Sequence, residues 1–569
     1  MFADCSDRRR IASSQFVSAF HPHPQPRTPN PPSSHSASVR RMPQIVVIGA
    51  GIGGISFGIA LRRQLGSTDF TIYEKASDVG GTWRDNIYPG ATSDVPTHFY
   101  SASTDLNPDW SSTHTSQHEM YVYWRKLASK YDLYSRIVFN RSVVSAEWSA
   151  KEQLYHIVTE DVHSGARSST TAKILISALG ILDIPRYPNI AGLSSFKGDM
   201  FHSARWDAGV DLRGKRVAVI GNGASAIQFV PLITEDPTIQ VTEFCRTPNW
   251  FVPPIRAKYS PLWKWTFRNV PFAMRFYRIF LYLRSETGYL RIFVNDAFRA
   301  KTTVLLANYI KAMAPEEYHD YLVPDYTLGC KRMLLDTNFL KSLHRPNLKL
   351  NWDGIQSVSD DGIVTKKGEK LPFDVMIFAT GFTADQYPVK VVGEAGNTVQ
   401  EYYDSQSGPK AYLGTTVPGF PNFFMIAGPN IATGHTSALL TEELQINYIL
   451  KFVKPILAGV VSTFSITTRA TDAYNELIQA RLSRSVWVQC MSWYRAGGEG
   501  KVSSIFPGPM FLFAWWVRKP RWEDYKVQPA AGREERWGRR MWCEKWAKRV
   551  NPAHYLGVMF GWFITWLSG

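Results

Sequence analysis

Two glycine-rich turns constrain the fold of this chain more than any other feature. The first, Gly49–Gly54, reads GAGIGG and follows the β-branched run 45–48. The second, Gly221–Ala226, reads GNGASA and follows the apolar run 216–220. A continuous apolar strand that leads into such a turn and then into a helix is typical of a parallel sheet that binds a dinucleotide. The sequence therefore predicts an α/β protein with two Rossmann-like dinucleotide-binding domains.

Each part of the first turn has a mechanical reason. Gly49 permits the tight turn, Gly51 lets the backbone approach a pyrophosphate, and Gly54 lets helix and strand pack closely. The N-terminus of the following helix offers free N–H groups to the phosphates. Glu74 follows the next strand, 70–73, where an acidic side chain can accept a hydrogen bond from a ribose hydroxyl.

The second turn differs at the end of its next strand. Gly221, Gly223 and Ser225 line the turn, and the strand 239–244 leads to Arg246 with no acidic residue at its end. A carboxylate there would favour NAD, whereas an arginine favours the 2′-phosphate of NADP. A solvated strand end is the alternative interpretation of Arg246. We predict FAD in the first site and NADPH in the second.

A loop rich in glycine and proline follows the first unit, from Gly80 to Pro96. Its composition predicts irregular structure that can lie flat beside a planar ring, with Thr82 and Trp83 at the flavin. A surface loop is the alternative, but it would leave Trp83 and Tyr88 exposed.

The net charge of +16 could indicate nucleic acid, but its distribution argues against that partner. The excess positive charge lies in three regions, 1–41, 251–326 and 516–549, so the nucleotide-binding core is close to neutral. We predict no nucleic-acid binding.

The five cysteines lie far apart, without a CxxC motif or a Cys/His cluster: Cys5, Cys245, Cys330, Cys490 and Cys543. This spacing predicts no metal site and no disulfide framework. A reducing, cytoplasmic compartment is expected.

Three segments lie outside the two nucleotide units. The Pro-, Ser- and Arg-rich residues 1–42 predict disorder. The segment 251–326 alternates aromatic and basic residues at helical spacing, which suits a substrate cap, an interfacial membrane helix or a plain helical subdomain. In the basic, Trp-rich tail 526–569, the apolar run 553–567 is too short to span a bilayer. That run could make peripheral membrane contact or dock on the protein.

The predicted organisation has seven segments. They are a disordered N-terminus (1–42), the first part of the FAD-binding domain (43–190), the first part of the NADPH-binding domain with its linker (191–250), the helical insert (251–326), the second part of the NADPH-binding domain (327–372), the second part of the FAD-binding domain (373–525) and the tail (526–569).

The linker before the second turn reads Phe-x-Gly-x-x-x-His-x-x-x-Trp-Asp, with Gly198, His202 and Trp206 at its fixed positions. This pattern resembles the fingerprint of the type I Baeyer–Villiger monooxygenases, and the resemblance extends over residues 43–525. Related N-hydroxylating enzymes usually carry Tyr or Phe where Trp206 stands.

The resemblance implies roles for further residues. Asp94, in YPGATSDVP, matches the family's active-site aspartate, and Arg332, in CKRMLLDT, matches its catalytic arginine. Asp94 would pair with Arg332 and hold its guanidinium in place. Trp493, in CMSWY, matches a tryptophan that contacts the nicotinamide nucleotide. His202 and Trp206 would couple the two domains. Met333 departs from members that have proline there.

The implied reaction inserts one oxygen of O₂ beside a ketone carbonyl, through a C4a-peroxyflavin, to give an ester or lactone in secondary metabolism. The implied cofactors are FAD and NADPH. Two alternatives stay open, namely oxygenation of nitrogen or sulfur on the same scaffold and a non-oxygenating binding protein. The ketone and the oligomeric state do not follow from the sequence.

Overall fold

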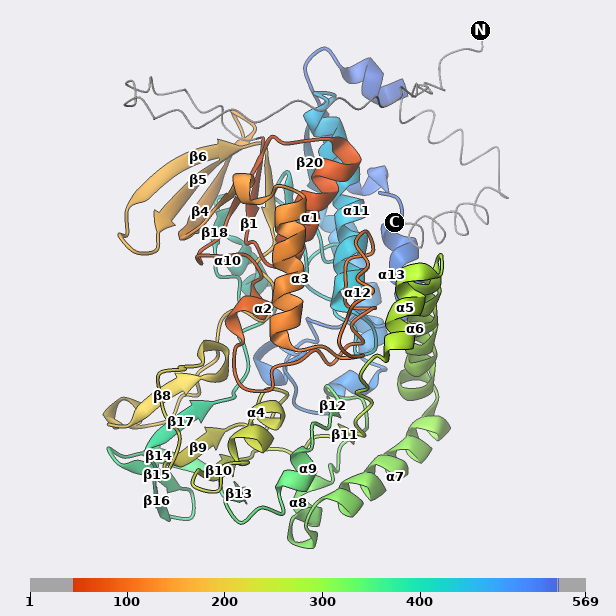
Figure 1. Cartoon of the computed structure of the whole chain (residues 1–569). Coiled ribbons are helices and arrows are strands. Elements are labelled where there is room, and N and C mark those ends of the chain that lie inside the picture. Colours follow the sequence, from red (N-terminus) through yellow and green to blue (C-terminus); the bar gives the residue numbers. More distant parts are fainter. Residues whose placement is uncertain (1–43, 540, 542–569) are drawn as a thin grey trace, which may run out of the picture. The chain divides into compact units, whose positions relative to one another are not determined.

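Two five-stranded parallel sheets organise the chain in this computed structural model, which describes residues 44–539 and residue 541 (Figure 1). The first sheet has the order β19-β7-β1-β2-β3, and its strands are β19 (Phe423–Met425), β7 (Ile174–Ser177), β1 (Ile45–Ile48), β2 (Phe70–Tyr73) and β3 (Ile137–Val138). The second has the order β13-β10-β9-β17-β8, and its strands are β13 (Leu348–Asn351), β10 (Gln240–Phe244), β9 (Arg216–Ile220), β17 (Val375–Phe378) and β8 (Asp199–His202). The predicted α/β class with two Rossmann-like domains is confirmed.

The first sheet is buried on both faces, which explains its continuous apolar strands. Ile45 and Val47 belong to one core with α1 (Ile52–Ala60), α3 (Gln117–Lys130) and α11 (Ala438–Leu457). Val46 and Ile48 face a second, four-stranded sheet in the order β18-β4-β5-β6. Its strands are β18 (Lys390–Val392), β4 (Arg141–Ser149), β5 (Leu154–Asp161) and β6 (Arg167–Ala172). Strands β4 and β5 form an antiparallel hairpin.

The second sheet is covered in the same way. Val217 and Val219 pack with α4 (Ala226–Ile233) and α9 (Phe339–Ser342). Ala218 and Ile220 pack on the other face, toward a small sheet made of β14 (Ile355–Val358), β15 (Gly362–Thr365) and β16 (Lys370–Pro372).

One expected boundary is wrong. Residues 373–525 were expected to belong to the FAD-binding domain, but β17, near the start of this range, pairs with β8 and β9 of the second sheet. Its sequence resembles that of β7 because both are buried parallel strands that run into a glycine turn. The chain therefore leaves the second sheet after Phe378, not at residue 372.

The insert is helical, as predicted. It contains α5 (Pro261–Asn269), α6 (Ala273–Tyr289), the π-helical turn η5 (Leu290–Val294), α7 (Asp296–Met313) and α8 (His319–Leu322). The short strands β11 (Phe251–Val252) and β12 (Leu334–Leu335) pair across its base.

The C-terminal part returns to the first core. Helices α12 (Thr468–Leu482) and α13 (Met510–Val517) follow α11, and β20 (Val461–Ile466) pairs with β21 (Tyr525–Pro529). The earlier helix α10 (Val399–Ser405) packs instead in the core of the four-stranded sheet. The start of the expected tail is thus the strand β21, and Trp537 is buried in the first core. Residues 1–42 and the run 553–567 lie outside the described residues. Within the described part, no helix is both long enough and apolar enough to cross a membrane.

Candidate active site

The first glycine turn forms a close-packed cradle at the carboxyl end of β1. Gly49 has φ +99°, and a Cβ there would lie 2.8 Å from the carbonyl oxygen of Ala178. A Cβ on Gly54 would lie 2.0 Å from the oxygen of Gly49, so only glycine allows α1 to start here. Glu74 is buried, and its carboxylate accepts hydrogen bonds from the N–H groups of Ala50 at 2.7 Å and Ala76 at 3.0 Å. Glu74 therefore fixes the backbone of the glycine turn through the N–H of Ala50.

The second glycine turn repeats this geometry at the end of β9. Gly221 has φ +103°, and a Cβ there would meet the oxygen of Ala379 at 2.7 Å. A Cβ on Gly223 would meet nothing within 4 Å, so this residue faces open space. Ser225 is the N-cap residue of α4. The open side of the turn thus faces the N-terminus of a helix, where a phosphate binds well.

Two cations lie at the end of β10, next to the second turn. Arg246 is exposed, and Lys331 is half-buried with its Nζ donating to Thr247 Oγ1 at 2.8 Å. Burial and then the positive charge of Arg246 lower the pKa of Lys331 to about 8. Two neighbouring basic side chains of this kind are suited to bind a dianionic group such as a 2′-phosphate.

The loop between residues 80 and 96 packs against the first turn, and part of it is regular. Residues Thr82–Asp85 form the short helix α2, although the composition predicted irregular structure throughout. Gly81 has φ +51°, and a Cβ there would lie 3.0 Å from the Cα of Gly51. Trp83 packs edge-on against Tyr100, with ring centroids 5.7 Å apart. The loop therefore lies against the pyrophosphate turn, where the sequence places Thr82 and Trp83.

Asp94 and Arg332 form an ion pair, as the resemblance implies. Arg332 donates from Nε at 3.0 Å and from Nη2 at 2.6 Å to one oxygen of Asp94, and from Nη1 to the oxygen of Gly434 at 3.2 Å. Loss of solvent opposes ionisation of Asp94, but the charge and hydrogen bonds of Arg332 outweigh it and lower the pKa of Asp94. The charge of Asp94 in turn raises the pKa of Arg332. Both groups are charged at neutral pH.

Trp493 is connected to the Asp94–Arg332 pair through its neighbour Tyr494. Its ring lies 4.5 Å from that of Tyr494, and its side chain is 42% exposed. Tyr494 is buried; burial raises its pKa to about 12, against the lowering effect of the Arg332 charge. The segment that carries Trp493 therefore lies beside Arg332.

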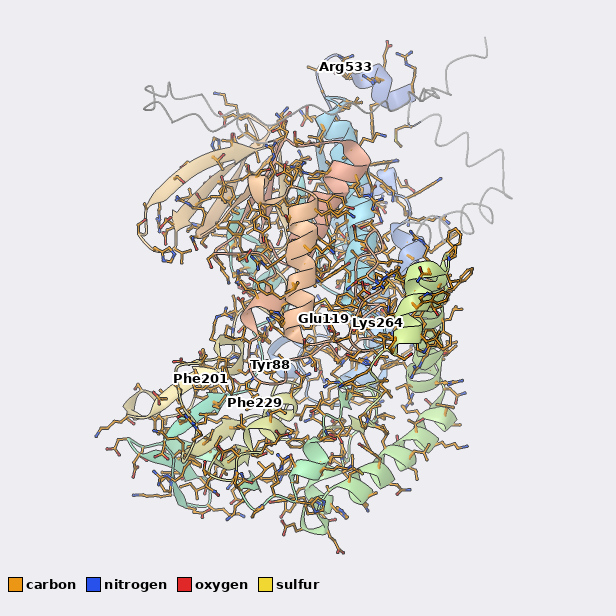
Figure 2. The ribbon with its side chains drawn as sticks, viewed as in Figure 1. Tyr88, Glu119, Phe201, Phe229, Lys264 and Arg533 are labelled. Carbon is orange, nitrogen blue, oxygen red and sulfur yellow. A yellow bond between two sulfur atoms is a disulfide. The ribbon has the colours of Figure 1, made fainter. Side chains whose placement is uncertain are left out.

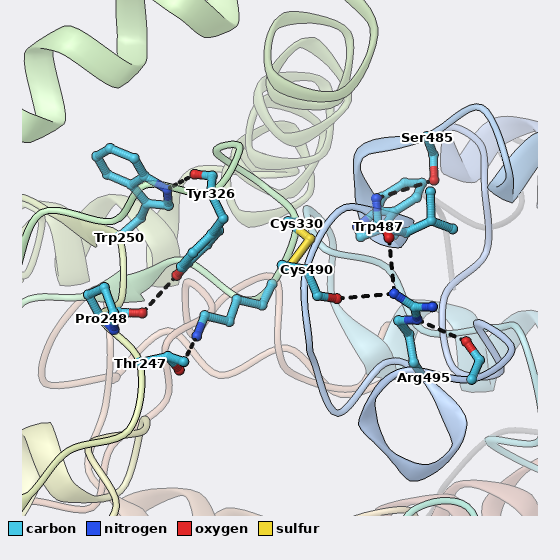
Figure 3. The surroundings of a disulfide bond; sticks show 12 residues. Thr247, Pro248, Trp250, Tyr326, Cys330, Ser485, Trp487, Cys490 and Arg495 are labelled. Atoms are coloured by element: carbon cyan, nitrogen blue, oxygen red, sulfur yellow. Dashed lines mark hydrogen bonds between the residues drawn. A yellow bond between two sulfur atoms is a disulfide. The ribbon is translucent and has the colours of Figure 1, made fainter. Parts of the chain in front are cut away.

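A disulfide joins these two segments, which corrects the prediction of no disulfide framework. Cys330, two residues before Arg332, is bonded to Cys490, three residues before Trp493 (Figure 3). The prediction from cysteine spacing was wrong because the fold brings together residues that are 160 positions apart. Arg495 stiffens the same loop by donating to the oxygens of Val488 at 3.0 Å and Gly500 at 2.8 Å.

The linker residues lie at the crossing between the two sheets. A Cβ on Gly198 would meet the oxygen of Asp374 at 2.4 Å, so glycine allows β8 to close on β17. His202 is fully buried, and its Nδ1 accepts from the N–H of Ala204 at 3.1 Å. Burial lowers the pKa of His202 to about 4, so the ring is neutral at pH 7. Its neighbours are Tyr187 and Phe382, one from each connection between the sheets.

A chain of aromatic rings connects the linker to the loop of Asp94. Trp206 packs edge-on against Phe201 at 5.2 Å and lies 5.3 Å from Phe229 on α4, which in turn contacts Tyr88 at 6.0 Å (Figure 2). Gln228, beside Phe229, accepts from the Tyr88 hydroxyl at 3.0 Å. Because Tyr88 contacts α4 in this way, a shift of α4 would displace the loop that carries Asp94.

Comparison with known proteins identifies the family. A family model described as pyridine nucleotide-disulphide oxidoreductase matches residues 46–263. A Baeyer–Villiger monooxygenase of Pseudomonas aeruginosa is 37% identical over 481 residues, which cover 84% of this chain and 89% of that protein. The chain belongs to the Baeyer–Villiger monooxygenase family. The FAD-binding monooxygenase ktnD of Aspergillus niger is 32% identical over 504 residues, which cover 84% of this chain and 81% of that protein.

Solved structures agree with this Baeyer–Villiger fold. The complex of OTEMO with FAD and NADP matches with a TM-score of 0.75 and 26% identity, covering 85% of this chain and 99% of that one. A steroid monooxygenase bound to NADP matches with a TM-score of 0.73 and 26% identity, covering 85% and 99%.

Some residues of this Baeyer–Villiger site were missed by sequence reasoning. Lys331 could have been noticed, because a lysine directly before the matched arginine is visible in the sequence. Gln228 and Tyr494 carry no such signal, since only the folded chain brings them to Tyr88 and Arg332.

Proposed function

We propose that this chain is an FAD-dependent, NADPH-consuming monooxygenase that inserts one O₂-derived oxygen beside a ketone carbonyl, giving an ester or lactone. The observation that carries the proposal is the Arg332–Asp94 pair, held on a loop next to Tyr494 and on the same chain as two glycine cradles. A fixed cation at such a place stabilises negative charge on oxygen, which this insertion requires.

The first cradle fits FAD. Gly49 and Gly54 leave no room for side chains, and Gly51 lies against Gly81, so backbone N–H groups can approach a pyrophosphate. A buried oxygen of Glu442 has no hydrogen-bond partner among the described residues, and a Cβ on Gly53 would lie 3.6 Å from it. This orphaned oxygen faces the cradle where the cofactor would lie.

The second cradle fits NADPH. Gly221, Gly223 and Ser225 would hold the pyrophosphate at the start of α4. Arg246 and Lys331 supply the positive charge that a 2′-phosphate needs, and Trp493 is exposed enough to cover the nicotinamide end.

When bound, NADPH would reduce FAD, and the reduced flavin would activate O₂. Arg332 would hold an anionic oxygen in place and stabilise the negative charge on the former carbonyl oxygen of the ketone. Asp94 would fix the plane of the guanidinium by its two hydrogen bonds. Tyr494 and Trp493 would exclude water from the same space.

His202 and Trp206 would couple the two domains. His202 is neutral and contacts rings from both connections, while Trp206 contacts α4 through Phe229. A role in secondary metabolism is the finer part of the proposal and comes from the resemblance to fungal members of the family.

The test is NADPH consumption by FAD-loaded protein with ketones, amines and sulfides, followed by mass spectrometry of the products. A ketone that gains one oxygen and then hydrolyses to an acid and an alcohol is the expected result. An N-oxide or S-oxide as the only product would overturn the ketone assignment and leave the cofactors in place.

A further inference from the structure

Helix α6 exposes a stripe of large apolar side chains. Phe276, Phe280 and Leu283 are spaced by four and three residues, so they lie on one face of the helix, and Phe272 is the N-cap residue that precedes them. The exposed fractions are 67% for Phe272, 66% for Phe276, 56% for Phe280 and 52% for Leu283. Exposed aromatic residues scattered singly are ordinary, but a continuous stripe of this kind marks a contact surface.

Helix α5 extends this stripe. Leu262, Trp263 and Trp265 are 71%, 51% and 57% exposed. The ring of Trp263 lies 6.0 Å from that of Tyr277 on α6, so the two helices pack against each other. Figure 1 shows α5 and α6 next to each other at one edge of the described fold. We call the exposed apolar residues of 262–283 the α5–α6 face.

The opposite side of α6 is fixed to the protein, so the face cannot rotate inward. Arg278 is buried and donates to the oxygen of Ser101 at 2.9 Å and to the oxygen of His98. Phe267 of α5 is 3% exposed, and its ring lies 4.4 Å from that of His98. The orientation of both helices is therefore set by buried contacts.

The exposed charges around the face are mostly positive. Besides the buried Arg278, the basic residues between Pro261 and Asn295 are Lys264, Arg268, Arg275, Arg284 and Arg291, and Arg268 forms an ion pair with Asp109. The one acidic residue in this stretch, Glu286, is buried and accepts from the N–H of Met510 at 2.9 Å. An apolar, Trp- and Phe-rich face with a basic surround is the pattern of a segment that lies in the interface of an anionic membrane.

We propose that the α5–α6 face docks on the surface of an anionic lipid bilayer. The aromatic rings would enter the boundary between headgroups and acyl chains, and the arginines and lysine would contact the acidic headgroups. A second copy of this chain fits less well, because a two-fold contact would set one basic rim against another.

The same helix leads toward the proposed active site. Helix α6 continues into η5, where Phe293 stacks on Trp487 at 4.8 Å and approaches Gly434, whose carbonyl oxygen accepts from Arg332. Docking through this face would thus place the membrane on the element that borders the site, which suits a lipophilic substrate.

The experiment is co-sedimentation of the full-length FAD-loaded protein with phosphatidylcholine vesicles that contain or lack phosphatidylserine. We expect binding that requires phosphatidylserine and weakens with salt, since the charges are exposed. The double variant Phe276→Ser/Phe280→Ser should bind at least about 100-fold more weakly, because two aromatic rings no longer enter the bilayer. Arg284→Glu should weaken binding by about 10-fold or more.

Matched controls keep the test specific. Val162→Ser/Leu477→Ser removes two exposed apolar side chains elsewhere, and Lys151→Glu reverses one exposed charge in the β4–β5 turn. All variants should keep their FAD content and their NADPH oxidation without vesicles. Absence of vesicle binding would overturn the proposal, as would binding that survives the Phe276/Phe280 change and is lost in Trp562→Ser/Trp566→Ser. A wild-type dimer that the double variant converts to monomer, without vesicle binding, would assign the face to a second copy instead.

Discussion

Arg332 Nε and Nη2 both donate to the same oxygen of Asp94, at 3.0 Å and 2.6 Å, across 238 positions of sequence. The side chains keep 26% and 40% of their exposure. The pair is therefore partly open to solvent, as contact with a ligand requires. Its accessibility favours the catalytic interpretation.

Replacing Arg332 should separate flavin reduction from oxygenation. In Arg332→Ala, reduction of the flavin by NADPH should stay within a few-fold of wild type, while ester formation should fall by about 100- to 1,000-fold, as when one oxyanion donor is lost. Stopped-flow absorbance of the flavin and mass spectrometry of the product measure the two steps. Arg332→Lys keeps the charge but not the paired geometry, so its ester yield should be intermediate. An ester yield from Arg332→Ala equal to that of wild type would contradict the catalytic role of Arg332.

Replacing Asp94 should lower activity by loosening the guanidinium of Arg332. Asp94→Ala leaves the guanidinium of Arg332 with its hydrogen bond to Gly434, and we expect ester formation to fall by about 10- to 100-fold with more hydrogen peroxide released per NADPH. The double variant with Arg332→Ala should be no worse than Arg332→Ala, because the carboxylate then has nothing to orient. Strictly additive losses in this double-mutant cycle would mean that Asp94 acts on its own.

Lys331 should distinguish NADPH from NADH. Lys331→Ala should raise KM for NADPH by about 10- to 100-fold, the value of a charge-assisted hydrogen bond, and change KM for NADH little. Because the pKa of Lys331 is about 8, its ammonium loses a proton as pH rises through that value. In wild type, KM for NADPH should therefore rise above pH 8 while KM for NADH stays flat. Equal effects of the substitution on KM for NADPH and NADH would mean that Lys331 has a structural role and does not contact the 2′-phosphate.

The sequence predicted what depends on local pattern. The glycine turns at Gly49 and Gly221 follow from local pattern, because a positive φ and a close carbonyl leave no other residue type possible there. The two main sheets followed from buried β-branched runs beside those turns. The strand β17 was assigned to the wrong sheet, since a buried parallel strand looks the same in either one.

Long-range contacts could not be predicted from local pattern. The Cys330–Cys490 bond joins residues 160 positions apart, and the hydrogen bond of Gln228 to Tyr88 spans 140. Neither leaves a periodic signal in the sequence. Arg332 and Asp94 were paired beforehand only because family resemblance carried the information that spacing lacks.

The Cys330–Cys490 bond should hold the Trp493 loop at the site. In Cys490→Ser, that loop loses its covalent tie to the Arg332 segment, so we expect several-fold more hydrogen peroxide per NADPH and a higher KM for NADPH. Closing a loop of this length can also stabilise the fold by up to about 5 kcal/mol. A thiol reductant should reproduce the effect in wild type and change nothing further in the variant. Cys245→Ser, at a free and buried cysteine, is the control and should not respond like Cys490→Ser. Wild-type coupling in both Cys490→Ser and reduced protein would refute this role.

Glu243 in β10 should make stability depend on pH. It is fully buried, neither carboxylate oxygen has a hydrogen-bond partner among the described residues, and burial raises its pKa to about 8. In the unfolded chain the carboxyl ionises near pH 4.5, so the folded state holds an extra proton between these values. Stability therefore falls as pH rises from 4.5 to 8, by roughly 3–4 kcal/mol over pH 5 to 8.

Glu243→Gln cannot ionise, so its advantage in unfolding free energy over wild type should be small at pH 5 and grow to about that amount at pH 8. Denaturant melts at several pH values measure the gap, with Glu476→Gln, an exposed carboxyl on α12, as the control. A gap that stays constant with pH would show that Glu243 is ionised in the folded protein, which its surroundings among Val219 and Leu350 on the neighbouring strands argue against.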